Sequence, residues 1–178
     1  ACRGSGRTKK RKKLSLRIPK GVETGSRLRL SGKGEGGARG GPAGDLYVVL
    51  HVKPHDLFQR RGDDLHCEVP VAMELCAVGG EIQVPTIDGY AKLKLAPGTE
   101  PDKVFRLRGK GVTNVEGYGR GDLHVHIRPQ IPVKLKGKQK QLLRELQELR
   151  ASANYPAVGR FKERADAFYE RRDAMNES

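Results

Sequence analysis

The stretch RLSGKG at residues 29–34 returns as RLRGKG at residues 106–111, an offset of 77 positions. The same offset aligns GDL at residues 44–46 with GDL at residues 121–123. Short segments with strand-like polarity flank both glycine-rich turns, and self-similarity at a fixed offset marks one supersecondary unit present twice. The sequence therefore predicts a mainly β fold with two tandem small β-sandwich-like domains and a C-terminal helical segment.

Each copy of the repeat is predicted to contain a strand, a turn, a second strand, a glycine-rich turn and a third strand. In the first copy Leu14, Leu16 and Ile18 alternate with polar residues, which predicts a half-buried strand. Strands at residues 27–30 and 46–52 follow, and the second copy repeats them at residues 104–107 and 123–127. An extra alternating segment at residues 65–71 precedes only the second copy. The first domain is therefore expected to be incomplete, and the chain to be a piece of a longer protein.

Beyond Pro132 the pattern becomes helical. A helix is predicted at about residues 138–150, followed by a second apolar stripe of Phe161, Ala165 and Phe168. The stripe on the first helix consists of Leu142, Leu143, Leu146 and Leu149.

Composition narrows the class of protein. The chain has 178 residues with 23 Gly, 10 Pro and no Trp, a balance that favours short strands joined by turns. It contains no apolar run of membrane-spanning length, so no membrane partner is expected, and its three cysteines fit a reducing, cytoplasmic compartment better than a disulfide framework. The net charge of +14, concentrated in the basic run at residues 7–13, leaves nucleic acid as an alternative partner.

Candidate chemistry is sparse. Residues 32–37 match GxGxxG, but a strand follows where a phosphate-binding loop needs a helix, so a turn is predicted. The carboxylates at Asp45, Asp122 and the pair 63–64 adjoin glycines, a context typical of turn closure. His124 and His126 share one strand face without a third metal ligand. No catalytic set emerges, so we do not expect an enzyme.

A set of motifs stands in order along the chain: CRGSG (2–6), LRIPKGV (16–22), GDLYV (44–48), HDLFQRRGDDL (55–65), GGEI (79–82), VPT (84–86), FRLRGKG (105–111) and QKQLL (139–143). Together these motifs resemble the C-terminal substrate-binding region of bacterial class A DnaJ co-chaperones, and CRGSG resembles the second half of a CxxCxGxG zinc repeat. The resemblance extends to about residue 150.

The resemblance implies four regions. Residues 1–13 would end the zinc-binding region and form a basic linker, residues 14–62 would be the second part of the first β-domain, residues 63–131 the second β-domain, and residues 132–178 a helical dimerisation segment. Cys2 would be a zinc ligand in the full-length parent only, and we expect this chain to hold no cofactor.

The resemblance also implies a stress-response chaperone that binds unfolded polypeptide clients, passes them to a DnaK-type chaperone and forms a homodimer. Client-binding candidates are Leu14, Leu16, Leu28, Leu30 and Phe58. Phe58, flanked by polar residues, is expected to be an exposed anchor, while the alternative places all five in a core. Dimer-interface candidates are Leu142, Leu143, Leu146, Leu149, Phe161 and Phe168. The alternative folds both helices back on one protomer.

Overall fold

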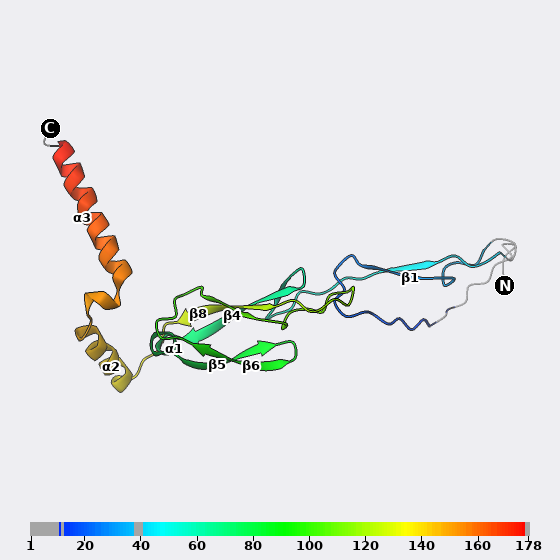
Figure 1. Cartoon of the computed structure of the whole chain (residues 1–178), viewed down its shortest axis with the longest axis horizontal. Helices are drawn as coiled ribbons and strands as arrows, with labels where there is room; N and C mark the ends of the chain where they lie inside the picture. The colour runs from blue at the N-terminus through cyan, green and yellow to red at the C-terminus, as the bar shows by residue number, and fades with distance from the viewer. Residues whose placement is uncertain (1–10, 12, 38–40, 177–178) are drawn as a thin grey trace. The chain divides into compact units, whose positions relative to one another are not determined.

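The computed structural model describes residues 11, 13–37 and 41–176, and the chain divides into two compact units, Ala1–Ile131 and Pro132–Ser178. Among the described residues, the strands lie in the first unit and the second unit contains only helices (Figure 1). The mainly β prediction is confirmed. The elements of the first unit are β1 Arg27–Leu30, β2 Leu46–Val49, β3 Gln59–Arg61, β4 Asp64–Ala72, α1 Met73–Val78, β5 Gly80–Thr86, β6 Gly89–Leu95, β7 Val104–Leu107 and β8 Leu123–Gln130.

The strands form three sheets. β1 and β2 pair antiparallel, β5 and β6 form a second antiparallel hairpin, and four strands assemble in the order β3-β4-β8-β7. Within this sheet β4 and β8 run parallel. Figure 1 shows the β5–β6 hairpin beside β4 and β8, and the side chains of these elements share one core.

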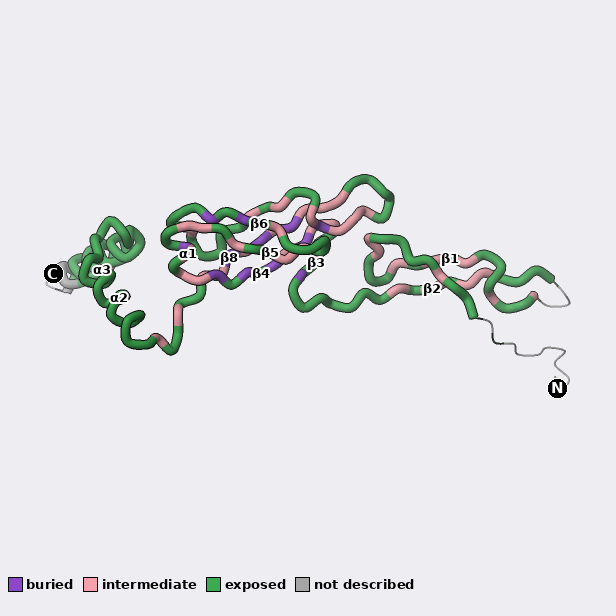
Figure 2. The backbone as a smooth tube through the Cα atoms, turned by 90° about the horizontal axis from the view of Figure 1, so that it is seen from below, coloured by how far each residue is buried: buried purple, intermediate pink, exposed green. Residues whose placement is uncertain are grey.

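The core lies in the second copy. Alternation along β4 and β8 turns every second side chain inward, where it meets the inner side of the β5–β6 hairpin. Figure 2 shows buried backbone positions along these strands and few elsewhere. The core residues are Phe58, Leu65, Cys67, Val69, Val71, Cys76, Val84, Leu93, Leu95, Leu123, Val125 and Ile127.

The 77-residue repeat folds into the same turn twice. The Gly34 amide donates to the Gly44 carbonyl at 2.7 Å, and the Gly111 amide donates to the Gly121 carbonyl at the same distance. Gly32 and Gly109, at φ 66° and 65°, occupy the left-handed region where glycine is favoured. The glycine-rich motif is therefore a turn, as predicted.

One predicted strand is wrong. The residues around Leu14, Leu16 and Ile18 form no regular strand. Their counterpart in the second copy, β6, is ordered by pairing with β5. By the same offset the counterpart of β5 falls at residues 3–9, outside the described residues, so the described structure contains no ladder partner for this segment.

The second unit consists of α2 Gly137–Glu148, a short 3₁₀ helix η2 Ser152–Asn154, and α3 Pro156–Asn176. These are the two predicted helices, and α3 begins at Pro156, where the fixed φ of proline suits the first helical position. Among the described residues, no helix is long and apolar enough to cross a bilayer.

Candidate functional site

The β1–β2 hairpin has two different faces. Its register places Leu28 opposite Val48 and Leu30 opposite Leu46, and these four side chains form one apolar, half-buried face. We call this set the hairpin face. The opposite side carries Arg27 and Arg29 with the exposed side chains of Tyr47 and Val49.

The hairpin face is more open than its counterpart in the second copy. Leu46 and Val48 are half-buried, whereas the residues 77 positions later, Leu123 and Val125, are both 0% exposed. The side chains are identical, so the difference arises from what covers them. In the second copy β4 pairs with β8, and the β5–β6 hairpin lies over the face. The described part of the first copy contains neither covering layer.

The structure divides the predicted client-binding residues. Leu28 and Leu30 share the hairpin face, Leu16 is half-buried, and Leu14 is 44% exposed. Phe58 is only 9% exposed and packs in the core of the second copy, so the expectation of an exposed anchor is wrong. Its polar neighbours in sequence suggested exposure, but the chain turns into β3 immediately afterwards and places the ring against that core.

A hollow of about 890 Å³ adjoins Phe58. Its lining includes apolar Leu65, Ile87 and Val112 from the second copy and Val52 from the connection after β2. Sequence reasoning missed this hollow because its walls come from segments far apart along the chain.

Arg60 and Gly21 hold the two copies together beside this hollow. Arg60 donates to the carbonyls of Gly21 at 2.8 Å and Val22 at 2.7 Å, and it pairs with Glu23 at 3.2 Å. Gly21, at φ 86°, approaches Thr113 so closely that an added Cβ would overlap the Thr113 carbonyl oxygen. Only glycine fits at this contact.

The carboxylates considered as catalytic groups accept hydrogen bonds that stabilise turns and connect strands. Asp45 accepts from the Gly32 amide at 2.9 Å, and Asp122 accepts from the Gly109 amide at 2.8 Å. Asp64 accepts from the Asp122 amide at 2.7 Å, and this bond lowers the pKa of Asp64. Asp63 accepts from the Asn114 side chain at 2.6 Å. These contacts match the turn role that the sequence context predicts.

The described residues do not fit a zinc site. They contain no group of three or more His, Cys, Asp or Glu side chains placed to hold a metal. Cys67 and Cys76 are buried free thiols, and burial raises the pKa of each, which disfavours the thiolate that zinc requires. Cys2, the predicted zinc ligand of the parent, lies outside the described residues.

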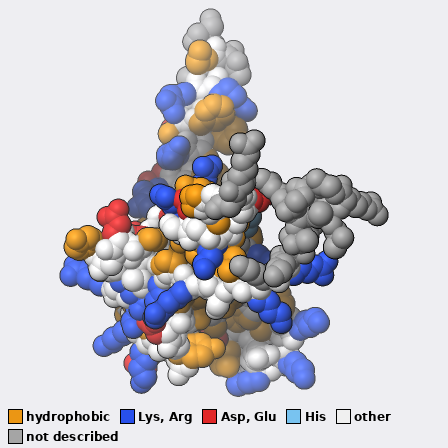
Figure 3. All heavy atoms as spheres, turned by 90° about the vertical axis from the view of Figure 1, so that its right-hand side faces the viewer, with side chains coloured by type: hydrophobic (Ala, Val, Ile, Leu, Met, Phe, Trp, Pro, Cys, Tyr) orange, Lys and Arg blue, Asp and Glu red, His pale blue; other side chains and the backbone are white. Residues whose placement is uncertain are grey.

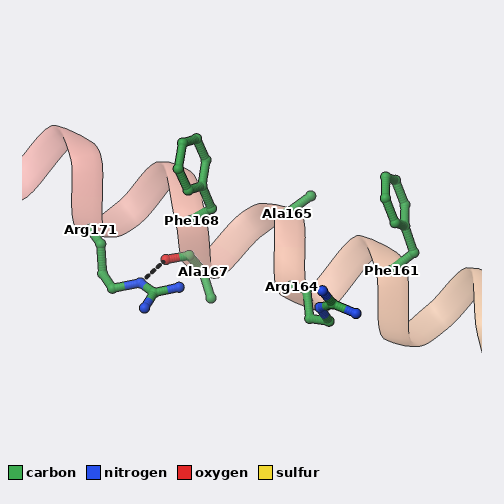
Figure 4. Close-up of a pocket in the computed structure, with 6 residues that line it drawn as sticks. All are labelled: Phe161, Arg164, Ala165, Ala167, Phe168 and Arg171. Carbon is green, nitrogen blue, oxygen red and sulfur yellow. Dashed lines mark hydrogen bonds between the residues drawn. The ribbon is translucent and has the colours of Figure 1, made fainter.

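The helical unit carries its own exposed apolar side chains. Phe161 and Phe168 are 73% and 57% exposed, and Figure 4 shows them with Ala165 on one side of α3. On α2, Leu142 and Leu146 are exposed and Leu143 is half-buried, and Leu149, directly after the helix, is exposed. These are the residues predicted for a dimer interface.

Basic side chains are widely distributed. On the face drawn in Figure 3, Lys and Arg side chains lie among hydrophobic ones. Of the basic run at residues 7–13, only Arg11 and Lys13 are described. Nucleic-acid binding by this basic run therefore stays a prediction, because most of the run lies outside the described residues.

The fold and the hairpin face define a tandem-repeat β protein with a half-buried apolar surface on its first copy. A family model described as DnaJ C terminal domain matches residues 4–132, and the chain belongs to this family. It is 51% identical over 164 residues to the chaperone protein DnaJ of Parageobacillus thermoglucosidasius, covering 92% of this chain and 43% of that protein. The DnaJ of Nitrosomonas europaea is 46% identical over 171 residues, covering 94% and 46%. The resemblance read from the motifs is confirmed, and the chain spans less than half the length of these relatives.

Proposed function

We propose that this chain is the client-binding and dimer-forming part of a DnaJ-type co-chaperone. One observation supports the site above others: Leu28, Leu30, Leu46 and Val48 form one apolar, half-buried face on the β1–β2 hairpin. Unfolded polypeptides offer apolar side chains, and removing both surfaces from water supplies most of the free energy of such binding. The hairpin face, with Leu14 and Leu16, forms the proposed client surface.

The backbone of the hairpin adds a second source of affinity. β1 and β2 form a two-stranded sheet among the described residues, so each strand has an outer edge. An extended client can add a strand to such an edge through main-chain hydrogen bonds, which do not depend on client sequence. This combination suits a protein that binds many unfolded clients without catalysing a reaction on them.

The exposed helix faces support a homodimer. A symmetric interface lets the stripe containing Phe161 and Phe168 pair with its own copy. Two client surfaces on one particle would then raise the effective concentration of the second surface for a long unfolded chain.

We also propose a DnaK-type chaperone as the downstream partner, since the relatives are named chaperone protein DnaJ, and a cytoplasmic location. We also propose that zinc belongs to the full-length parent and that this chain binds none. The catalytic alternative has no support in the carboxylates described above.

Neighbouring valines of β2 provide a matched test of the client surface. Val48 lies on the hairpin face and Val49 on the opposite side. The unaltered chain should delay aggregation of an unrelated unfolding protein. Val48→Ser should weaken binding of a fluorescent apolar peptide by about 1–3 kcal/mol, and Val49→Ser should leave it nearly unchanged.

Two results would count against the proposal. Equal effects of Val48→Ser and Val49→Ser, in variants whose circular dichroism shows intact folding, would remove the hairpin face as the site. Binding that falls steeply between low and high salt would instead indicate phosphate contacts and favour nucleic acid, since apolar binding does not weaken with salt in that way.

A further inference from the structure

Three of the five histidines gather on the outer face of the four-stranded sheet, away from the core. His66 lies on β4, and His124 and His126 lie two positions apart on the adjacent parallel strand β8. The register places His66 beside His124 and Glu68 beside His126. We call the three residues the histidine trio. The proposed client surface does not use them.

The rings are in direct contact across the two strands. His66 Nδ1 and His126 Nε2 are 3.0 Å apart, a hydrogen bond between two ring nitrogens. The rings of His66 and His124 stack with centroids 4.8 Å apart and planes at 14°. A bond between two imidazole nitrogens holds one hydrogen, so it is lost when both rings are protonated and both nitrogens are donors.

Acidic side chains lie close to the rings of the trio. His124 Nε2 lies 3.4 Å from Asp64 Oδ2, and Glu68 lies beside His126 in the strand register. Glu68 is itself paired with Arg128, which also binds Asp102. The charged or polar groups facing the trio from each strand are Gln59 and Arg61 on β3, Asp64 and Glu68 on β4, Arg106 on β7 and Arg128 on β8.

The surroundings of His66 disfavour its protonated form. Partial burial, the positive charge of Arg61 and the two neighbouring histidines together lower the pKa of His66, against a weaker opposing effect of Asp64. Protonating the trio therefore places like charges in rings that contact one another across β4 and β8, the central pair of the sheet.

We propose that the histidine trio is an acid-sensitive clamp between β4 and β8: neutral rings hold the two strands together, and protonation loosens them. The device goes beyond client binding, because it makes the second β-domain respond to pH in the mildly acidic range.

The direction of the effect follows from proton linkage. His66 in the unfolded chain has the ordinary pKa of about 6.5, and in the folded chain its pKa is lower. As pH falls through about 6.5 the unfolded chain binds more protons than the folded one, so the free energy of unfolding decreases. This stability is fully present above that pH and is lost below it.

Thermal unfolding of the 178-residue chain at pH 7.5 and pH 5.0 tests the clamp. The fall in Tm between these pH values should be at least roughly 2 °C smaller in His66→Gln than in the unaltered chain, because glutamine does not titrate. His51→Gln, which removes an exposed histidine of the first copy, should leave the fall unchanged. Equal falls in the unaltered chain and His66→Gln would overturn the proposal.

A measurement on the unaltered chain covers the case in which His66→Gln does not fold. Titration of the histidine ring signals by NMR should place the pKa of His66 below 6.5, and amide exchange in β4 and β8 should quicken at pH 5.0 relative to the intrinsic rate. A His66 pKa at or above 6.5, or exchange in these strands that follows only the intrinsic rate, would refute the clamp.

Discussion

Truncating the same leucine in each copy measures how differently the two copies are packed. Leu46 and Leu123 begin β2 and β8, face Leu30 and Leu107 in the same register, and differ in exposure. Leu123 is 0% exposed, so Leu123→Ala should leave a cavity and cost about 3–5 kcal/mol of the free energy of unfolding.

Leu46→Ala should cost much less. Leu46 is half-buried, so water already reaches part of the side chain and can occupy the space left by truncation. Roughly half of the transfer free energy of a leucine, about 1 kcal/mol, is expected to be lost. The two variants should therefore differ by about 2–4 kcal/mol although the chemical change is identical.

Guanidinium unfolding monitored by circular dichroism provides the measurement, with amide exchange of β2 and β8 to assign each loss to its copy. Leu46→Ala should also weaken apolar peptide binding, whereas correctly folded Leu123→Ala should not. Similar losses of stability in the two variants would refute the reasoning, because the hairpin face would then be packed as tightly as the core of the second copy.

Three further outcomes are expected. Phe58→Ala should lower the free energy of unfolding, measured in guanidinium, by about 3–5 kcal/mol, as for a core aromatic residue. A loss below about 1 kcal/mol would show that Phe58 is an exposed side chain and not part of the core. Sedimentation at micromolar concentration should show twice the chain mass for the intact chain and a single chain mass after truncation at Gly137, while a monomeric intact chain would contradict the dimer. Asp122→Ala should cost about 1–2 kcal/mol, since the Gly109 amide loses its acceptor, with Asp122→Asn as the milder control; no measurable loss would show that this bond contributes nothing to the turn.

Much of the fold could be predicted because local patterns are strong. Period-two alternation indicated β4 and β8, a 3.6-residue stripe indicated α2 and α3, and glycines at Gly32 and Gly109 indicated the turns. Each of these signals depends on the chain's own neighbours, and each corresponds to an observed element.

The predicted strand containing Leu14 and Leu16 shows where such patterns fail. Alternation describes which side chains share a face, but a strand forms only when a partner satisfies its backbone groups. The described residues hold no such partner for this segment. The client-binding and dimer roles of the named residues stay predictions for a related reason, since each requires a second molecule.

By itself, the sequence determined the mainly β class, the repeat at 77 positions, the two turn-closing aspartates and the family. Tertiary structure alone decided that Phe58 joins the core of the second copy, that Arg60 binds the Gly21 turn, and that His66 meets the two histidines of β8. Local patterns report spacing along one segment, whereas burial and ring contacts depend on segments that are distant in sequence. Identical residues at Leu46 and Leu123 therefore differ in exposure, because the layers that cover β8 come from elsewhere in the chain.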